Sequence, residues 1–154
     1  MRDKLTIFLA TGAFVGYSPA APGSLGTLWG VGAVWLLSGA GVYWNGAAVV
    51  VVTLVSIYIA HRAAAIIGQK DPKCVVIDEV CGLMTASFMV PFGSKTVILV
   101  FLLFRFFDIL KPWPVSSIDR GMGGGAGIVL DDVAAGVYAN IFAQIIIRAA
   151  AWSL

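Results

Sequence analysis

The sequence predicts an all-α protein: a polytopic membrane bundle of about five membrane-associated helices, preceded by a short N-terminal helical segment. Hydrophobic residues make up 60% of the 154 residues and charged residues only 12%, whereas soluble domains carry about 25% charged residues. The mean hydropathy is +0.95, and residues 5–60 contain no Asp, Glu, Lys or Arg. A water-soluble domain of this length could not bury so much apolar surface. One membrane domain over residues 1–154 is therefore expected.

Apolar stretches between turn-forming residues define the expected helices. The turn-rich interval 16–26 and the glycine-rich interval 38–46 divide the uncharged N-terminal part of the chain. The expected elements are an N-terminal segment at 4–15 and spans near 26–37, 46–60, 75–91, 96–110 and 133–152. A span takes about 20 residues, so the first one must borrow flanking residues or be partly re-entrant.

The distribution of basic residues tests this topology. With a cytoplasmic N-terminus and five alternating spans, only Lys95 and Arg148 of the ten Lys and Arg residues lie on the outer side. The inner side receives Arg2, Lys4, Arg62, Lys70, Lys73, Arg105, Lys111 and Arg120. This is the positive-inside pattern. It also brings the loop 16–27 and the regions 71–79 and 105–132 to one membrane surface.

Several other chemistries are poorly supported. Cys74 and Cys81 are seven residues apart, which fits no zinc pattern, and we expect them to be small apolar residues without a disulfide. His61 is the only histidine, so Ser-His-Asp hydrolysis lacks support. The formal charge of +2 is too small to indicate nucleic-acid binding. No feature specifies an oligomeric state.

The acidic residues are concentrated in unusually apolar sequence. Apart from Asp3, all lie between Asp71 and Asp132. The stretches are V-V-I-D-E-V-C-G (75–82), F-R-F-F-D-I-L-K-P-W-P (104–114) and G-I-V-L-D-D-V-A-A-G (127–136). An ionised carboxylate in such surroundings is costly unless it is paired, hydrogen-bonded or bound to a metal. Positive partners are therefore expected among these residues.

Local spacing supplies some of these partners. Asp108 is three residues from both Arg105 and Lys111, so a helix would place the acid between two bases. A purely structural set of ion pairs at the membrane boundary is the alternative. Asp78 and Glu79 begin a predicted helix, and a helix cap would account for only one of them. Asp131 and Asp132 follow a glycine-rich stretch, where capping of the last helix competes with a functional role.

Several carboxylates with a single histidine suit a hard cation such as Mg²⁺. Carboxylates that hold Mg²⁺, together with Arg and Lys, describe a phosphate site. The loop G-Y-S-P-A-A-P-G-S-L-G-T (16–27) offers backbone amides and the hydroxyls of Ser18, Ser24 and Thr27 as further anion ligands.

These stretches, in this order, resemble the phosphatidylglycerophosphatase A family. The matching segments are 16–27, 76–82, 104–114 and 124–139. The resemblance implies a Mg²⁺-dependent bacterial enzyme, multi-pass in the inner membrane, that acts at the cytoplasmic side. Its implied reaction removes the terminal phosphate of phosphatidylglycerol phosphate to give phosphatidylglycerol. The residues implicated are Asp78, Glu79, Arg105, Asp108, Lys111, Asp131 and Asp132.

The expected mechanism assigns roles to these residues. The expected metal ligands are Asp78, Asp108, Asp131 and Asp132, and the expected catalytic residues are Asp78, Glu79 and Asp108. Arg105 and Lys111 would hold the phosphate with Ser24 and Thr27. Glu79, or an Asp beside a metal-bound water, would serve as base. Direct attack by water and an aspartyl-phosphate intermediate both stay open. A small membrane carrier for an anionic lipid or phosphorylated metabolite, or a structural subunit of a membrane complex, are the alternative functions.

Overall fold

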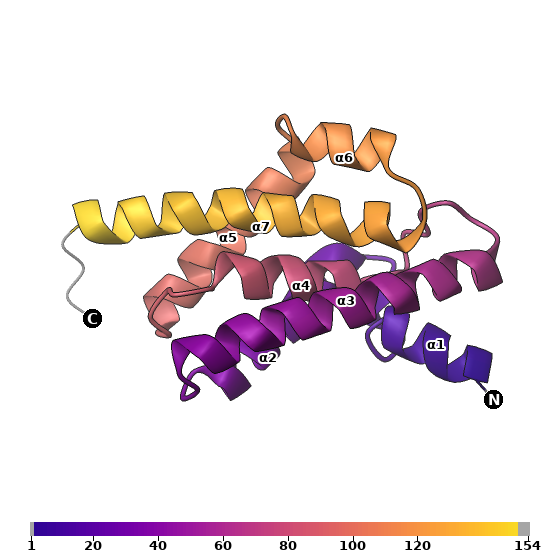
Figure 1. The fold of residues 1–154 in the computed structure, drawn as a ribbon, viewed down its shortest axis with the longest axis horizontal. Helices are drawn as coiled ribbons and strands as arrows, with labels where there is room; N and C mark the ends of the chain where they lie inside the picture. Colours follow the sequence, from indigo (N-terminus) through magenta and orange to yellow (C-terminus); the bar gives the residue numbers. More distant parts are fainter. Residues whose placement is uncertain (1, 151–154) are drawn as a thin grey trace.

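The computed structural model describes residues 2–150, and that part of the chain contains helices and no strands (Figure 1). The elements are α1 (Arg2–Ala10), the 3₁₀ turn η1 (Val15–Tyr17), α2 (Pro22–Leu37), α3 (Val42–Ile67), α4 (Ile77–Ala86), α5 (Ser94–Leu110), α6 (Val115–Gly121) and α7 (Gly124–Ala149). The predicted all-α class is confirmed. The helix count exceeds the prediction because the short α6 was not expected; the end of the last predicted span, residues 151–152, lies outside the described residues.

Two helices are long and apolar enough to cross a bilayer. α3 and α7 each have 26 residues, with mean hydropathies of 2.0 and 1.4 in their most apolar windows. At about 1.5 Å per residue, each reaches about 39 Å and exceeds the hydrocarbon core of about 30 Å. The outer surface of α3 exposes Val51 and Leu54 at 58% and 63%, which suits contact with lipid. These features suggest a membrane protein.

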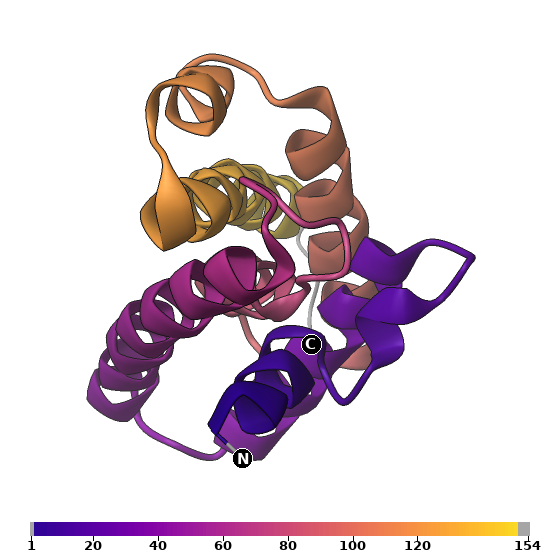
Figure 2. The same ribbon diagram turned by 90° about the vertical axis from the view of Figure 1, so that its right-hand side faces the viewer.

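The predicted span at 75–91 is wrong in its length. α4 covers only ten residues of it, which is about 15 Å of helix, and it is too short to cross a bilayer. The helix begins after Val76, its N-cap, and stops at Ala86, before Met89, whose φ is +58°. α4 instead lies in the centre of the bundle, between α7 on one side and α2 and α3 on the other (Figures 1 and 2).

The glycine-rich interval before Asp131 forms helix where a loop was expected, so α7 begins at Gly124 and not at Val133. The reason is that these glycines allow the start of α7 to pack closely against neighbouring backbone. A Cβ atom at Gly125 would overlap the Ile57 carbonyl oxygen of α3, and one at Gly127 would overlap the Met122 carbonyl oxygen. The glycines thus allow close backbone approach within a helix. Small residues serve the same purpose in other membrane helix pairs.

Two apolar clusters flank α4 and hold the bundle together. One joins α4, α5 and α7 around Leu83, Val100 and Phe104. The other joins α1, α3, α4 and α7 around Ala60 and Val129. Cys81 is buried in the second cluster, Cys74 is partly exposed, and both cysteines are free.

Candidate active site

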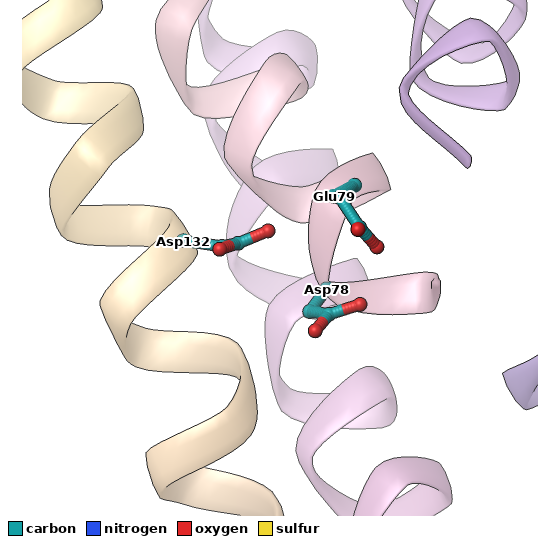
Figure 3. A group of neighbouring side chains, drawn as sticks. All are labelled: Asp78, Glu79 and Asp132. Atoms are coloured by element: carbon teal, nitrogen blue, oxygen red, sulfur yellow. The ribbon is translucent and has the colours of Figure 1, made fainter. Parts of the chain in front are cut away.

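Three carboxylates converge where the first turn of α4 meets α7 (Figure 3). Asp78 and Glu79 come from α4, and Asp132 comes from α7. One oxygen from each lies within 4.8 Å of the others. Neither α4 nor α7 has a side-chain hydrogen bond at its N-cap, and Asp132 lies two turns inside α7. Helix capping, the alternative for these acids, is therefore excluded.

One oxygen of each of these three carboxylates lacks the partner that a buried charge requires. Asp78 Oδ1, Glu79 Oε2 and Asp132 Oδ2 are buried and have no hydrogen-bond partner among the described residues. Burial raises the pKa of Asp78 well above its ordinary value, and the neighbouring charges of Glu79 and Asp132 raise it further. Burial also raises the pKa of Glu79, against the opposing effects of the adjacent Asp78 carboxyl group and of Arg105. A cation among these oxygens would stabilise their ionised forms. Oxygen donors of this kind fit a hard divalent ion.

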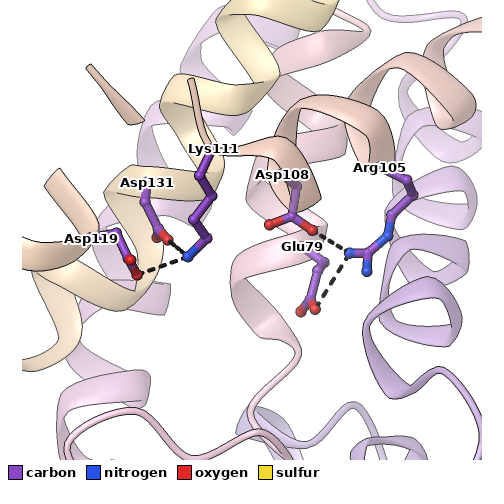
Figure 4. A network of polar contacts seen from close by, with 6 residues as sticks. All are labelled: Glu79, Arg105, Asp108, Lys111, Asp119 and Asp131. Carbon is purple, nitrogen blue, oxygen red and sulfur yellow. Dashed lines mark hydrogen bonds and ion pairs between the residues drawn. The ribbon is translucent and has the colours of Figure 1, made fainter. Parts of the chain in front are cut away.

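Arg105 connects this group to Asp108 on α5 (Figure 4). Arg105 Nη1 lies 2.6 Å from Asp108 Oδ2 and 3.7 Å from Glu79 Oε1. The predicted pairing of Arg105 with Asp108 across one helical turn is confirmed. The side chains of Arg105 and Asp108 are only 17% and 14% exposed, so solvent screens their interaction weakly.

Lys111 makes different ion pairs from those that its spacing predicts. α5 ends at Leu110, and Lys111 takes a left-handed conformation with φ of +46°. Its Nζ donates to Asp119 Oδ1 and Asp131 Oδ2, each at 2.7 Å (Figure 4). The prediction that Asp108 pairs with both Arg105 and Lys111 is therefore confirmed for Arg105 and wrong for Lys111. Although burial acts to lower the pKa of Lys111, the two carboxylates outweigh it and raise the pKa above its ordinary value.

Ser24 and Thr27 lie in α2, not in a loop. Thr27 is fully buried and donates its hydroxyl to the Gly23 carbonyl oxygen at 2.8 Å. Ser24 lies in the first turn of α2 and is half-buried. The neighbouring Gly23 faces the charged residues directly, because a Cβ atom there would overlap Glu79 Oε1 and lie 2.9 Å from Arg105 Nη2. The start of α2 thus forms one wall of the site.

Sequence reasoning missed Gly23 and Asp119. Gly23 stood among several glycines of one loop, and nothing local distinguishes the one that meets Glu79 and Arg105. Asp119 lies in the short α6, within S-S-I-D-R-G. An acid directly followed by a base, here Arg120, is typical of an ordinary exposed surface. The signal that was available for Asp119 is its position between two motifs that the sequence already assigned to one membrane surface.

The site has a large excess of acid. Six of the eight carboxylates of the chain lie in it, against the two cationic side chains of Arg105 and Lys111. With all groups ionised, the balance is four negative charges. An anionic phosphate group would be repelled unless cations neutralise part of this charge. The arrangement therefore suits a phosphate ester only together with metal ions, which is the combination found in metal-assisted phosphoryl transfer.

Comparison with known proteins identifies the group of proteins to which this arrangement belongs. Escherichia coli K12 phosphatidylglycerophosphatase A is 32% identical over 130 residues, which cover 84% of this chain and 76% of that protein. The Haemophilus influenzae protein of the same name is 37% identical over 135 residues, with 86% and 83% coverage. A Bacteroides thetaiotaomicron protein, provisionally named a phosphatidylinositol-3-phosphatase, is 38% identical over 146 residues, with 89% and 90% coverage.

No solved structure matches the chain. The family model described as phosphatidylglycerophosphatase A matches residues 8–147, a range that includes every residue of the site described above. With the relatives that share this name, that match shows that the chain belongs to the phosphatidylglycerophosphatase A family.

Proposed function

We propose that this protein hydrolyses the terminal phosphomonoester of phosphatidylglycerol phosphate, giving phosphatidylglycerol and inorganic phosphate in phospholipid biosynthesis. The observation that carries the proposal is the convergence of six carboxylates with Arg105 and Lys111, from segments far apart in the sequence. Membership of the phosphatidylglycerophosphatase A family supports the same reaction. A carrier for anionic lipids would need basic groups in excess, whereas this site has acids in excess.

The cofactor we propose is Mg²⁺. Asp78 and Asp132 would hold it, and Glu79 lies within reach of the same ion. Asp108 and Asp131, which the sequence also suggested as ligands, each have a basic partner at 2.6 Å and 2.7 Å, so their first role is to orient Arg105 and Lys111. When bound, the ion would neutralise phosphoryl oxygens and lower the pKa of water.

The residues of the chain supply the remaining steps. Arg105 and Lys111 would bind the phosphate oxygens, and their carboxylate partners hold both cations in place before the substrate arrives. Glu79 is the best-placed base, because Oε1 faces Arg105 while Oε2 is free to accept a proton from the attacking water. Ser24, at the start of α2, is a further candidate ligand of the phosphate, whereas the hydroxyl of Thr27 is already bonded to the Gly23 carbonyl oxygen.

We also propose that the protein is a multi-pass protein of the bacterial inner membrane with this site at the cytoplasmic surface. The site lies at the end of the bundle where α3 finishes and α7 begins (Figure 1). Lys95 lies near the start of α5 and Arg148 near the end of α7, at the other end. The other eight basic residues lie towards the end that contains the site, as the positive-inside pattern requires of a cytoplasmic surface.

The test is phosphate release from defined lipids by the purified protein in detergent micelles. We expect release from phosphatidylglycerol phosphate that requires Mg²⁺ and stops with EDTA. Asp78→Asn and Asp132→Asn should each lower kcat/KM by about 100-fold or more, because each removes a ligand charge. Asp3→Asn removes an equal charge from a remote, exposed ion pair and should leave the rate unchanged.

Two outcomes would contradict the proposal in different ways. Release from phosphatidylinositol 3-phosphate in preference to phosphatidylglycerol phosphate would refute the substrate and leave the hydrolase chemistry intact. Binding of either lipid without phosphate release would instead support the carrier alternative. Fully active and folded Asp78→Asn and Asp132→Asn variants would show that the site is misassigned.

A further inference from the structure

Asp119 holds Lys111 from the exposed side of the site. Its side chain is 33% exposed, and that of Lys111 is 31% exposed. The opposite partner, Asp131, is only 7% exposed and lies on α7 between Ile128, Val129 and Asp132, all buried. Both carboxylates are 2.7 Å from the same ammonium group. The pair is thus asymmetric: one partner is fixed inside the bundle and the other faces solvent.

The two partners also differ in how firmly the fold holds them. Asp119 lies on the seven-residue α6, which packs on α7 at the edge of the bundle (Figures 1 and 2). Val115, at the other end of α6, is buried in the core. The connection to α7 passes through Gly121 and Gly123, where an added Cβ atom would meet nothing within 4 Å. Gly121 and Gly123 themselves therefore make no packed side-chain contact, while the backbone of Met122 between them lies against Gly127 of α7.

A phosphate that binds Lys111 has to compete with these carboxylates. An ammonium group has three donors, and two of them already serve Asp119 and Asp131. The charge of Lys111 is shared between two anions, so its attraction for a third is weak. Displacing Asp131 would leave a buried carboxylate unpaired, which is costly, whereas a displaced Asp119 can be solvated by water. Phosphate would therefore displace Asp119, and not Asp131, from Lys111.

We propose that Asp119 occupies the place of a phosphoryl oxygen on Lys111 and competes with phosphate for it, so that this residue sets how tightly the site holds substrate and product. The inference rests on the proposed function, in which Lys111 binds phosphate. It assigns to Asp119 a role opposite to that of Asp131. Asp131 positions Lys111 for phosphate, while Asp119 weakens phosphate binding and thereby favours product release.

The primary test compares inhibition by inorganic phosphate in the wild type, Asp119→Asn and Asp3→Asn, all with Mg²⁺. Loss of a half-exposed competing charge should lower the inhibition constant for phosphate about three- to tenfold in Asp119→Asn. Asp3→Asn changes the net charge equally and should not alter it. If Asp119 only positions Lys111, Asp119→Asn will raise the inhibition constant and KM; that result, or no change, overturns the proposal.

A second measurement compares the wild type with Asp119→Asn in the absence of lipid. Saturating inorganic phosphate should increase hydrogen exchange of the backbone amides of α6, because displaced Asp119 frees the end of that helix. In Asp119→Asn the exchange should be fast already and insensitive to phosphate. Unchanged exchange in the wild type under conditions where equilibrium titration shows phosphate bound would refute the competition.

The titration also separates the two proposals. Tighter phosphate binding by Asp119→Asn in a protein that releases no phosphate from phosphatidylglycerol phosphate would leave the role of Asp119 intact and refute the function.

Discussion

Substituting Gly23 by alanine should impair catalysis with little effect on folding. The new Cβ atom would overlap Glu79 Oε1 and would lie 2.9 Å from Arg105 Nη2, where ordinary contacts begin at 3.4 Å. Arg105 must therefore retreat by about half an ångström and Glu79 by more. Both atoms are at the far ends of flexible side chains, so the shift costs little stability. A displacement of about 1 Å in a catalytic group lowers rates by about 100-fold, and we expect a loss of kcat/KM of about 10- to 100-fold.

The same helix provides a matched control. Gly32 also lies in α2, and a Cβ atom there would meet nothing within 4 Å. Gly32→Ala should retain full activity and a thermal midpoint equal to or above that of the wild type, because alanine favours helix by about 1 kcal/mol over glycine. The assay is phosphate release in micelles, with the thermal midpoint of each variant measured in parallel. Wild-type kcat/KM in folded Gly23→Ala, or equal losses in both variants, would refute the placement of α2 against Glu79 and Arg105.

Two further predictions concern stability. Gly136→Ala would make a Cβ atom overlap the Gly82 carbonyl oxygen of α4. Because a backbone atom cannot easily move aside, we expect the free energy of unfolding to decrease by about 1–3 kcal/mol, measured as a lower thermal midpoint. A midpoint equal to that of the wild type would contradict the close packing of α4 on α7. In the metal-free protein, the folded-state pKa values of Asp78 and Glu79 are raised, so their contribution to stability is present below the unfolded values of about 4 and is lost as pH rises through the folded values. The thermal midpoint with EDTA should therefore decrease as the pH rises above about 4. At a pH where it has decreased, addition of Mg²⁺ should restore it, and in Asp78→Asn this recovery should be smaller.

The parts of the site that could be predicted from the sequence are those that depend on neighbours along the chain. Arg105 and Asp108 meet because they lie one helical turn apart, and Asp78 and Glu79 are adjacent residues in the first turn of α4. Both inferences use a spacing of four residues or fewer, where helix geometry decides the outcome. The concentration of acids in apolar sequence indicated that they would need positive partners, and the structure provides basic partners for Glu79, Asp108, Asp119 and Asp131.

The parts that could not be predicted depend on contacts between distant segments. The pairing of Lys111 with Asp119 and Asp131 joins residues 8 and 20 positions away, and it depends on a left-handed conformation at the end of α5. The glycines that start α7 read as a loop, because only the approach of the α3 backbone at Ile57 explains their helical role. The short α4 read as a membrane span, because apolar composition does not distinguish a helix buried by its neighbours from one that crosses lipid.

The six carboxylates of the site differ in how their charge is stabilised, and this difference identifies the one that depends most on a cation. Asp78 and Glu79 lie in the first turn of α4, where the helix dipole favours negative charge. Asp108 has Arg105, while Asp119 and Asp131 share Lys111. Asp132 is 4% exposed, lies inside α7 away from its N-terminus, and has no basic partner among residues 2–150. An isolated buried carboxylate of this kind is costly unless an ion accompanies it. A structural role therefore explains Asp132 less well than it explains the other five carboxylates. A bound cation explains it best.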